Sequence, residues 1–276
     1  MSQDTRQEHV SKRTVVYRIP GMDEVRVSRD VEYRATGAGA LTADIYYPPG
    51  YGGAARMPAV VFVIGYPDSG AEARLGCKFK EMGAYTSWGR LAAASGLVAI
   101  TYTNREPATD IHALLQHLRQ NAARLGIDEN RIGVWACSGN VPLALSVLTG
   151  EANDYVKCAV LCYGFMLDLD GSAIVAEAAE RWGFVNPRAG RSVNDLPPRL
   201  PLFIARAGRD QMPRLNETID RFLLHAVTRD LPVTFVNHRA APHAFDLFDD
   251  GETSRELIRQ ILAFMRFHLS AAPAGG

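Results

Sequence analysis

The sequence predicts an α/β protein: a mostly parallel, twisted sheet of about eight strands with helices on both faces. Short apolar segments alternate along the chain with longer segments of helical periodicity, a pattern typical of βαβ units. Several of the apolar segments have no polar interruption, as strands buried on both faces require. Hydrophobic residues make up 47% of the 276 residues, which is enough to form the core of such a sheet.

Residues 1–50 carry β signals of a different kind. Apolar residues gather at 14–19 and again between Val25 and Tyr33, and residues 41–47 alternate in polarity. The Pro-Pro-Gly sequence at 48–50 ends the last of these segments. We therefore expect N-terminal antiparallel strands at one edge of the sheet.

The remaining strands and helices follow in alternation. Continuous or nearly continuous apolar segments predict strands at 59–64, 97–102, 131–136, 156–162, 202–207 and 232–237. Apolar stripes predict helices at 84–95, from Thr109 or Asp110 to 125, at 141–148, at 215–226 and at 257–269. Gly96 and Gly126 are expected to end the first two helices in a left-handed conformation.

One long interruption, residues 165–198, separates two of the predicted strands just before residue 202. It contains a predicted helix at 174–182 and a Pro-rich exit. Insertions of this length often form a lid or a substrate-binding element, so the segment is a candidate lid. With no repeat or low-complexity tract elsewhere, we expect a single domain over residues 1–276.

The charge balance limits the kinds of partner. With 30 basic and 30 acidic residues, the chain lacks the basic excess that a nucleic-acid binder or a polybasic membrane anchor needs. We therefore expect a small-molecule partner, no nucleic acid and no membrane, and we leave a homodimer open. The polar first residues do not have the pattern of a secretory signal, and Cys77, Cys137, Cys158 and Cys162 match no paired zinc pattern. A cytoplasmic protein with reduced thiols is the expectation.

A serine lies where a strand is expected to run directly into a helix. The predicted strand 131–136 is followed by Cys137-Ser138-Gly139-Asn140 and then by the helix 141–148. A tight turn there lifts the serine hydroxyl above the sheet edge and directs the N–H of Gly139 toward an oxyanion. Residues 136–140 resemble the G-x-S-x-G nucleophile turn of the α/β-hydrolase superfamily, with Ala136 and Asn140 in place of the two glycines.

The same resemblance implies an acid and a base in the order Ser, Asp, His. Asp210 follows the predicted strand 202–207, and His243 follows the last strand. His243-Ala244-Phe245 is similar to the H-G-F of the dienelactone-hydrolase-like and related esterase branch. The resemblance extends from about residue 41 to 269 and implies an α/β-hydrolase fold with a catalytic triad of Ser138, Asp210 and His243.

Other residues remain as alternatives for these roles. Asp168 follows the strand 156–162, where some members of the superfamily place the acid, and His238 is a second candidate base. Cys137 is a further candidate nucleophile because dienelactone hydrolases proper use cysteine, although the turn position falls on the next residue. His112 and His117 are expected at the surface of a helix.

The loop after the strand 59–64 is expected to complete the site. In the superfamily this loop supplies a second oxyanion N–H, which implies the N–H of Tyr66 beside that of Gly139. Gly65 allows close approach of the backbone, and Gly65, Asn140 and Phe165 are expected to contact the substrate. Residues 74–80 are expected to be a solvated loop, with an anion-binding role as the alternative. Six residues are candidates for an apolar acyl pocket: Tyr85, Trp88, Phe165, Met166, Trp182 and Phe184.

Together these residues predict a serine hydrolase that cleaves carboxylic esters of small molecules through an acyl-enzyme, with no cofactor and no metal. One alternative keeps the triad but acts on a thioester, lactone or peptide, because a fold and a triad do not determine the bond that is cleaved. The other alternative is a non-catalytic binding protein of the same fold, suggested by Ala136, Asn140 and Ile64 in place of the family's glycines and histidine.

Overall fold

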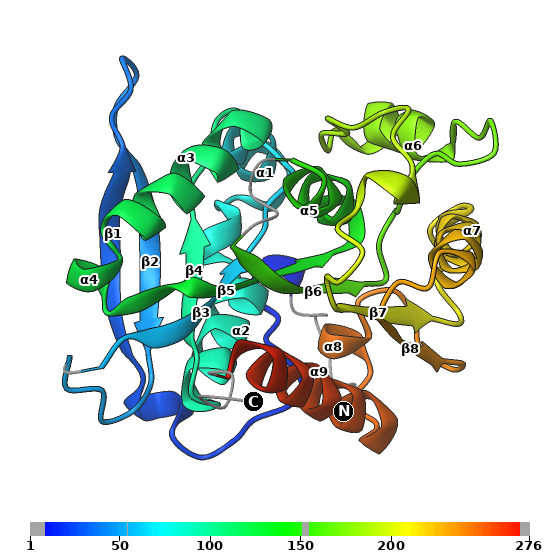
Figure 1. Ribbon diagram of the computed structural model, residues 1–276. Helices are drawn as coiled ribbons and strands as arrows, with labels where there is room; N and C mark the ends of the chain where they lie inside the picture. The colour runs from blue at the N-terminus through cyan, green and yellow to red at the C-terminus, as the bar shows by residue number, and fades with distance from the viewer. Residues whose placement is uncertain (1–8, 54, 151–154, 271–276) are drawn as a thin grey trace, which may run out of the picture.

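The computed structural model describes residues 9–53, 55–150 and 155–270. They contain an eight-stranded sheet in the order β1-β2-β4-β3-β5-β6-β7-β8 (Figure 1). The strands are β1 Arg26–Arg34, β2 Leu41–Tyr47, β3 Met57–Phe62, β4 Val98–Tyr102, β5 Ile127–Cys137, β6 Val156–Cys162, β7 Leu202–Ala207 and β8 Val233–His238. β3 to β8 are parallel, while β1 and β2 are antiparallel at one edge. The predicted α/β sheet and its antiparallel edge are confirmed.

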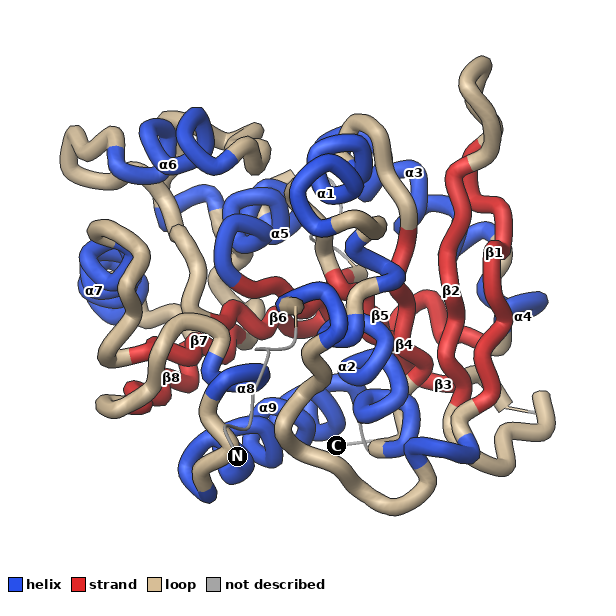
Figure 2. The backbone as a smooth tube through the Cα atoms, turned by 180° about the vertical axis from the view of Figure 1, so that it is seen from behind, coloured by secondary structure: helices blue, strands red, loops and turns tan. Residues whose placement is uncertain are grey.

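Helices cover both faces of this sheet (Figures 1 and 2). α2 (Gly83–Ala94) and α9 (Glu252–Leu269) lie on one face, and α3 (Pro107–Gln120) and α5 (Val141–Leu148) lie on the other. α7 (Leu215–Thr228) packs against β7. The shorter helices are α1 Asp68–Leu75, α4 Ala122–Leu125, α6 Ile174–Trp182 and α8 Phe245–Phe248, with 3-10 turns η1 Val10–Lys12, η2 Met22–Glu24, η3 Phe79–Glu81, η4 Ser138–Asn140 and η6 Val193–Asp195.

The core lies between the sheet and these helices. Every residue of β4 is buried, and β3 is buried from residue 59 to 62, which explains their largely apolar sequences. On α3 the stripe of Ile111, Leu114, Leu115 and Leu118 is at most 1% exposed, as the i, i+3, i+4, i+7 spacing predicts. This packing fixes the strand ends from which the site residues emerge.

The prediction of a strand at residues 14–19 is wrong. The Val15 N–H donates, at 2.9 Å, to the hydroxyl oxygen of Ser87, which lies on α2. The Val16 N–H donates to the Asp246 carbonyl oxygen at 2.8 Å, on α8. Both N–H groups therefore donate to helices and not to a neighbouring strand. The segment is irregular and forms no strand of the sheet.

α3 begins earlier than its predicted caps. Its first residue is Pro107, which suits the first turn of a helix because it needs no hydrogen-bond acceptor. Asp110 lies inside that turn, and its carboxylate accepts the N–H groups of Arg105 and Glu106 at 2.8 Å each. Gly96 after α2 and Gly126 after α4 are both left-handed, as predicted.

The prediction of a solvated loop at residues 74–80 holds only in part: Arg74 and Gly76 are exposed, but the segment ends in η3 and in a buried lysine. Lys80 is buried, and its ammonium donates to Asp30 at 2.6 Å and to Asp44 at 2.9 Å. Asp30 lies on β1 and Asp44 on β2, so η3 is fastened to the antiparallel edge of the sheet. The lysine serves as an internal counter-ion, which removes the anion-binding alternative for its side chain.

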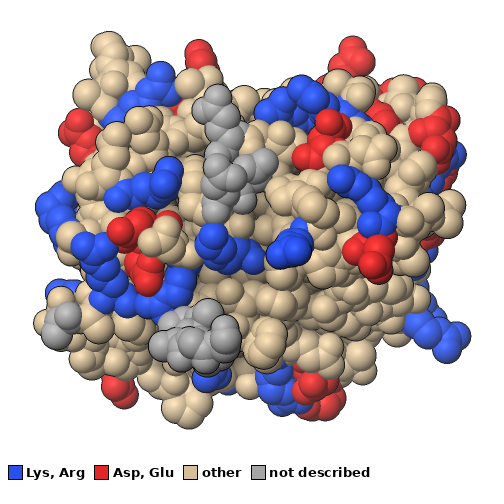
Figure 3. All heavy atoms as spheres, viewed as in Figure 1, with Lys and Arg blue, Asp and Glu red and all other residues tan. Residues whose placement is uncertain are grey.

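The charged surface is mixed in sign. On the face in Figure 3, basic and acidic side chains are interspersed. None of the helices in the described ranges has the length and apolar character needed to cross a bilayer.

Candidate active site

Ser138 lies directly after β5, at the start of η4, with φ of 55°. This left-handed backbone conformation is rare for residues other than glycine. It is the strained conformation that the serine adopts in a nucleophile turn. At Gly139, an added Cβ would lie 2.2 Å from Tyr66 Oη and 2.6 Å from a ring carbon of Phe184. The position after the serine therefore accepts glycine alone without displacement of its neighbours.

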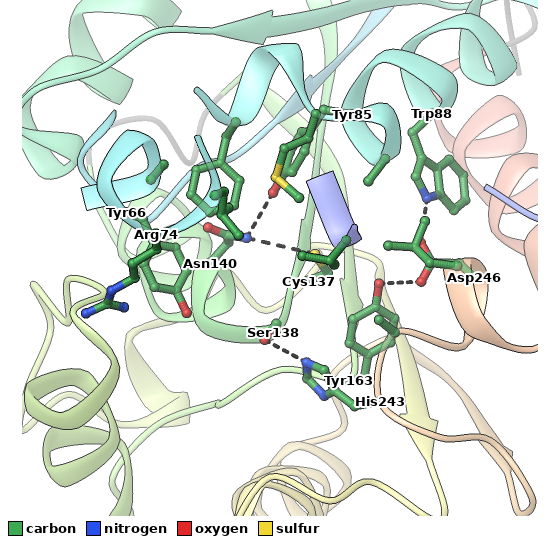
Figure 4. A pocket seen from close by; sticks show the side chains of 18 of the residues that line it. Tyr66, Arg74, Tyr85, Trp88, Cys137, Ser138, Asn140, Tyr163, His243 and Asp246 are labelled. Carbon is green, nitrogen blue, oxygen red and sulfur yellow. Dashed lines mark hydrogen bonds between the residues drawn. The ribbon is translucent and has the colours of Figure 1, made fainter. Parts of the chain in front are cut away.

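The three predicted triad residues are hydrogen-bonded in series. Ser138 Oγ lies 2.9 Å from His243 Nε2, and His243 Nδ1 lies 2.7 Å from Asp210 Oδ2 (Figure 4 shows the serine and the histidine). Because a carboxylate accepts, Nδ1 carries the proton and Nε2 is left to accept from the serine hydroxyl. The other oxygen of Asp210 accepts the Met212 N–H at 2.9 Å. The carboxylate, which has no exposed surface, is thus fixed in place by two donors.

The alternative residues lie elsewhere or have other partners. Asp168 accepts the N–H groups of Val175 and Ala176 at 2.8 and 2.9 Å, so it holds the first turn of α6. His238 is buried between Ser254, at 3.0 Å, and Asp249, at 3.2 Å. Neither side chain joins the series that begins at Ser138.

The remaining alternatives also lack the features of a nucleophile or base. Cys137 lies beside the site, but burial raises the pKa of its thiol to about 12. An uncharged thiol is a weak nucleophile. On α3, His112 is exposed and His117 is half-buried.

Asn140, which stands where the superfamily's turn has glycine, connects the two loops expected to form the oxyanion site. Its Oδ1 accepts the Gly65 N–H at 2.7 Å, and its Nδ2 donates to Tyr85 Oη at 3.0 Å. A Cβ at Gly65 would lie 3.0 Å from the Gly139 carbonyl oxygen, so the two loops are in close contact. This contact brings Tyr66 beside Gly139, while the oxyanion role of their N–H groups stays a prediction.

A cavity of about 450 Å³ opens beside Ser138 and His243 (Figure 4). Its lining is mainly apolar and aromatic, as in most small-molecule sites. Most of the lining residues come from 66–88 and 243–248. The charged or titratable side chains among them include Arg74, His243 and Asp246.

The predicted acyl pocket needs correction. Tyr85 and Trp88 line the cavity, whereas Phe165, Met166, Trp182 and Phe184 are not among the described residues that line it. Phe165 is 1% exposed and stacks on Phe184 with ring centres 5.5 Å apart. Phe184 in turn meets the Tyr66 ring edge-on at 5.9 Å. Phe165 therefore supports the cavity wall from behind.

The candidate lid contributes a small part of this wall. Gly183 lines the cavity, and the Val185 N–H donates to the Gly65 carbonyl oxygen at 2.9 Å. Arg74 donates to the Trp182 carbonyl oxygen from the other side. The segment after α6 is thus in contact with the loop after β3, and its movement as a lid stays a prediction.

Sequence reasoning missed a buried network next to His243. The Tyr163 ring meets the imidazole edge-on, with centres 5.1 Å apart. Tyr163 Oη donates to Asp246 Oδ1 at 2.6 Å, and Trp88 Nε1 donates to Asp246 Oδ2 at 2.7 Å. Burial raises the pKa of Asp246 above its usual range, against the opposing effect of these two hydrogen bonds. The position of Asp246, three residues after His243, was the one local signal in the sequence.

Comparison with solved structures identifies the fold. A thermophilic esterase from the Planctomycetes species Thermogutta terrifontis is 21% identical, with 94% of this chain and 98% of that chain covered and a TM-score of 0.62. An α/β hydrolase from a Medee basin deep-sea metagenome library is 16% identical over 89% and 98%, with a TM-score of 0.62. A bacterial brefeldin A esterase, described as a homologue of human hormone-sensitive lipase, is 14% identical over 95% and 82%, with a TM-score of 0.71.

No protein-family model matches the sequence, and no curated protein does. At the identities of the solved structures, the likeness establishes the architecture, which is the α/β-hydrolase fold. The fold implied by residues 136–140 is confirmed, and membership of the dienelactone-hydrolase-like branch stays a prediction.

Proposed function

We propose that this chain of α/β-hydrolase fold is a serine hydrolase that cleaves carboxylic esters of small molecules through an acyl-enzyme intermediate. The observation that carries the proposal is the hydrogen-bonded series Ser138–His243–Asp210 beside an apolar cavity. Nucleophile, base and orienting acid each follow a different strand, at the carboxyl edge of the sheet where such folds place their sites.

In the first half-reaction, Ser138 Oγ attacks the ester carbonyl carbon while its proton passes to His243 Nε2. Asp210 holds the Nδ1–H and stabilises the imidazolium as it forms. The oxyanion accepts hydrogen bonds from the N–H groups of Gly139 and Tyr66, a type of interaction that stabilises the transition state by about 3 kcal/mol per donor. The intermediate then expels the alcohol, which takes the proton from His243.

In the second half-reaction, water takes the place of the alcohol. His243 removes a proton from the water, which attacks the acyl carbonyl. Collapse of the second tetrahedral intermediate releases the carboxylic acid and returns the proton to Ser138 Oγ. The two half-reactions balance with the ester and one water molecule as the reactants.

The choice of an ester as substrate rests on the cavity and on the similar structures. A largely apolar space of about 450 Å³ suits a small uncharged acyl group. Two of the similar proteins are described as esterases, and the Thermogutta enzyme has also been seen phosphoramylated by tabun and phosphonylated by sarin. Such modification of a relative supports a nucleophile of the same kind here.

The test is the variant Ser138→Ala with p-nitrophenyl acetate and butyrate. We expect kcat to fall by about 10⁴-fold or more, since the nucleophile is lost. A matched control is Ser95→Ala, whose hydroxyl bonds to the Ala92 carbonyl oxygen at the far end of α2 and is expected to matter little. Circular dichroism of both variants checks that the fold is kept. Turnover by Ser138→Ala equal to that of the wild type would refute the assignment.

A fluorophosphonate probe separates the proposal from a non-catalytic binding protein. We expect stoichiometric labelling of the wild type, with the adduct on Ser138 by peptide mass spectrometry. An adduct on Cys137 would reassign the nucleophile, and no adduct would favour a binding protein. A panel of thioesters, lactones and peptides, each compared with the p-nitrophenyl esters, then tests which acyl bond is preferred.

A further inference from the structure

We propose that the end of the cavity formed by Asp246, Trp88 and Tyr163 binds a cationic ammonium group, so that the preferred esters carry an alkylammonium a few bonds from the carbonyl. The inference rests on the proposed function and adds to it the chemical class of the substrate. It starts from a carboxylate that neither the triad nor the oxyanion site uses.

Asp246 has an unusual environment for a carboxylate. It is 2% exposed, yet it lines the cavity. Its two hydrogen-bond donors, Trp88 and Tyr163, are both neutral. Within the described ranges, no lysine, arginine or histidine forms an ion pair with it. A carboxylate has about four acceptor positions, so capacity remains for a cationic donor or a contact cation.

The rings that line the cavity favour a cation over an anion. Six aromatic residues line the cavity besides Tyr66: Phe79, Tyr85, Trp88, Trp135, Tyr163 and Phe248. The faces of such rings carry partial negative charge and attract ammonium groups, most strongly where water is excluded. An anion would meet both the carboxylate and these ring faces, which would repel it.

The one guanidinium among the described lining residues is remote from this end. Figure 4 places Arg74 on the opposite side of the cavity from Asp246, with Ser138 and His243 between them. Arg74 also donates to the Trp182 carbonyl oxygen. The Asp246 end therefore has no lysine or arginine among the described lining residues, and His243, whose charge acts on Asp246, is already paired with Asp210. A cationic substrate group would supply a counter-ion of its own for Asp246.

The distance to the reacting atoms limits the substrate. A single side chain, Tyr163, contacts the His243 ring with its edge and Asp246 with its hydroxyl. Because the same tyrosine contacts both groups, an ammonium beside Asp246 would lie on the His243 side of the site, which favours a short linker to the carbonyl. Esters of short amino alcohols have this geometry.

The experiment compares a cation with a neutral molecule of the same shape. Choline and 3,3-dimethylbutan-1-ol differ in one atom type, and their binding is measured by calorimetry on the intact protein. We expect choline to bind about tenfold more tightly or better, and Asp246→Asn to abolish that preference. Asp250→Asn is the matched control, since this exposed carboxylate pairs with Arg255 at the surface. Equal binding of the two alcohols to the wild type would overturn the proposal.

A second variant separates charge recognition from a supporting role. Tyr163→Phe removes one donor to the carboxylate but keeps the charge, so we expect it to keep the preference for choline. A merely structural Asp246 would act through Tyr163, and the two variants would then behave alike. This comparison also remains informative if Asp246→Asn folds poorly.

The last measurement distinguishes failure of this proposal from failure of the proposed function. The acetyl esters of the two alcohols are compared by the ratio of their kcat/KM values, and we expect a ratio of about ten or more in favour of the cation. Hydrolysis of both esters at equal rates would overturn the ammonium site alone. Absence of hydrolysis and of fluorophosphonate labelling would overturn the serine hydrolase.

Discussion

Two buried carboxylates lie close to His243 and are held in different ways. Asp210 binds the imidazole directly at 2.7 Å and has no exposed surface. Asp246 reaches the same ring only through Tyr163, and its own hydrogen bonds come from a phenol and an indole. Both are aspartates in short segments after parallel strands, so neither the residue type nor its burial separates their roles.

The partner of each carboxylate makes the difference. The imidazole of His243 is protonated transiently in the proposed reaction. Asp210 therefore stabilises a positive charge that is present only during catalysis. The donors to Asp246 stay neutral, and burial therefore raises its pKa. We therefore expect Asp246, whose donors are neutral, to be available to a ligand, whereas Asp210, which is bound to the base, serves the proposed reaction.

The largest expected effect comes from Asp210→Asn. The amide can donate to His243 Nδ1 and so favours the wrong tautomer, which should lower kcat by about 10⁴-fold. Steady-state hydrolysis of p-nitrophenyl acetate measures it. Asp168→Asn is the control, because Asp168 holds the first turn of α6. If Asp168→Asn lost activity and Asp210→Asn kept it, the acid would be reassigned.

A third buried carboxylate, Asp44, has a permanently charged partner, and its contribution can be measured as a change in the free energy of unfolding. Asp44 is 2% exposed and accepts from Lys80. Lys80→Met leaves it without this buried counter-ion and should lower the free energy of unfolding by about 3–5 kcal/mol. Urea unfolding followed by tryptophan fluorescence measures the loss.

The control for that experiment is Arg18→Met, which removes the exposed pair of Arg18 with Asp23. Exposed pairs contribute about 1 kcal/mol or less, so this variant should unfold close to the wild type. Equal losses in the two variants would show that the Lys80 pair is not a buried one in solution.

Asp68 shows what happens when a buried carboxylate is only partly satisfied. Its Oδ2 accepts the Asn104 N–H at 2.9 Å, its Oδ1 has no partner among the described residues, and burial raises its pKa to about 6. The folded state therefore holds the proton more tightly than the unfolded state, whose pKa is 3.8. The resulting stabilisation is complete below pH 4 and is lost as the pH rises through 6.

Asp68→Asn should remove this pH dependence. Between pH 4 and pH 7 the wild type should lose about 2 kcal/mol of unfolding free energy relative to the variant. Urea unfolding of both proteins at the two pH values measures the difference. A difference that stays constant with pH would contradict the prediction.

The smallest effect is expected from Tyr163→Phe. The ring that contacts His243 remains, while one hydrogen bond to Asp246 is lost, which corresponds to about 1 kcal/mol and a several-fold fall in kcat/KM for a neutral ester. A fall in activity as large as that of Asp210→Asn would mean that Tyr163 and Asp210 contribute equally to the function of His243.

The sequence predicted those features that depend on local pattern. β4 is buried throughout and β3 is buried from residue 59 onward, so their largely apolar sequences predict their type. β6 is buried except at Lys157. Ser138 could be found because it follows β5 directly, and Asp210 and His243 could be found because they lie a few residues after β7 and β8. Their mutual geometry follows from the shared sheet edge.

The features that were missed depend on distant partners. Residues 14–19 look like a strand, but their hydrogen bonds go to Ser87 and Asp246. Asp246 itself depends on Trp88 and Tyr163, which come from α2 and from the loop after β6. Phe165 does not line the cavity and stacks instead on Phe184, which comes from the segment after α6. No local period or motif carries such information.

The irregular stretch near the start of the described chain also affects the order in which the molecule assembles. Val10 lines the cavity, and the Val16 N–H bonds to the carbonyl oxygen of Asp246. The cavity is therefore complete only after residues near the two ends of the described chain have come into contact. Contacts between residues so far apart in the sequence form slowly. On refolding from urea, we expect helical circular dichroism to return before turnover does. If the proposed function is correct, we expect no turnover until residues 10–16 and 243–248 have come together.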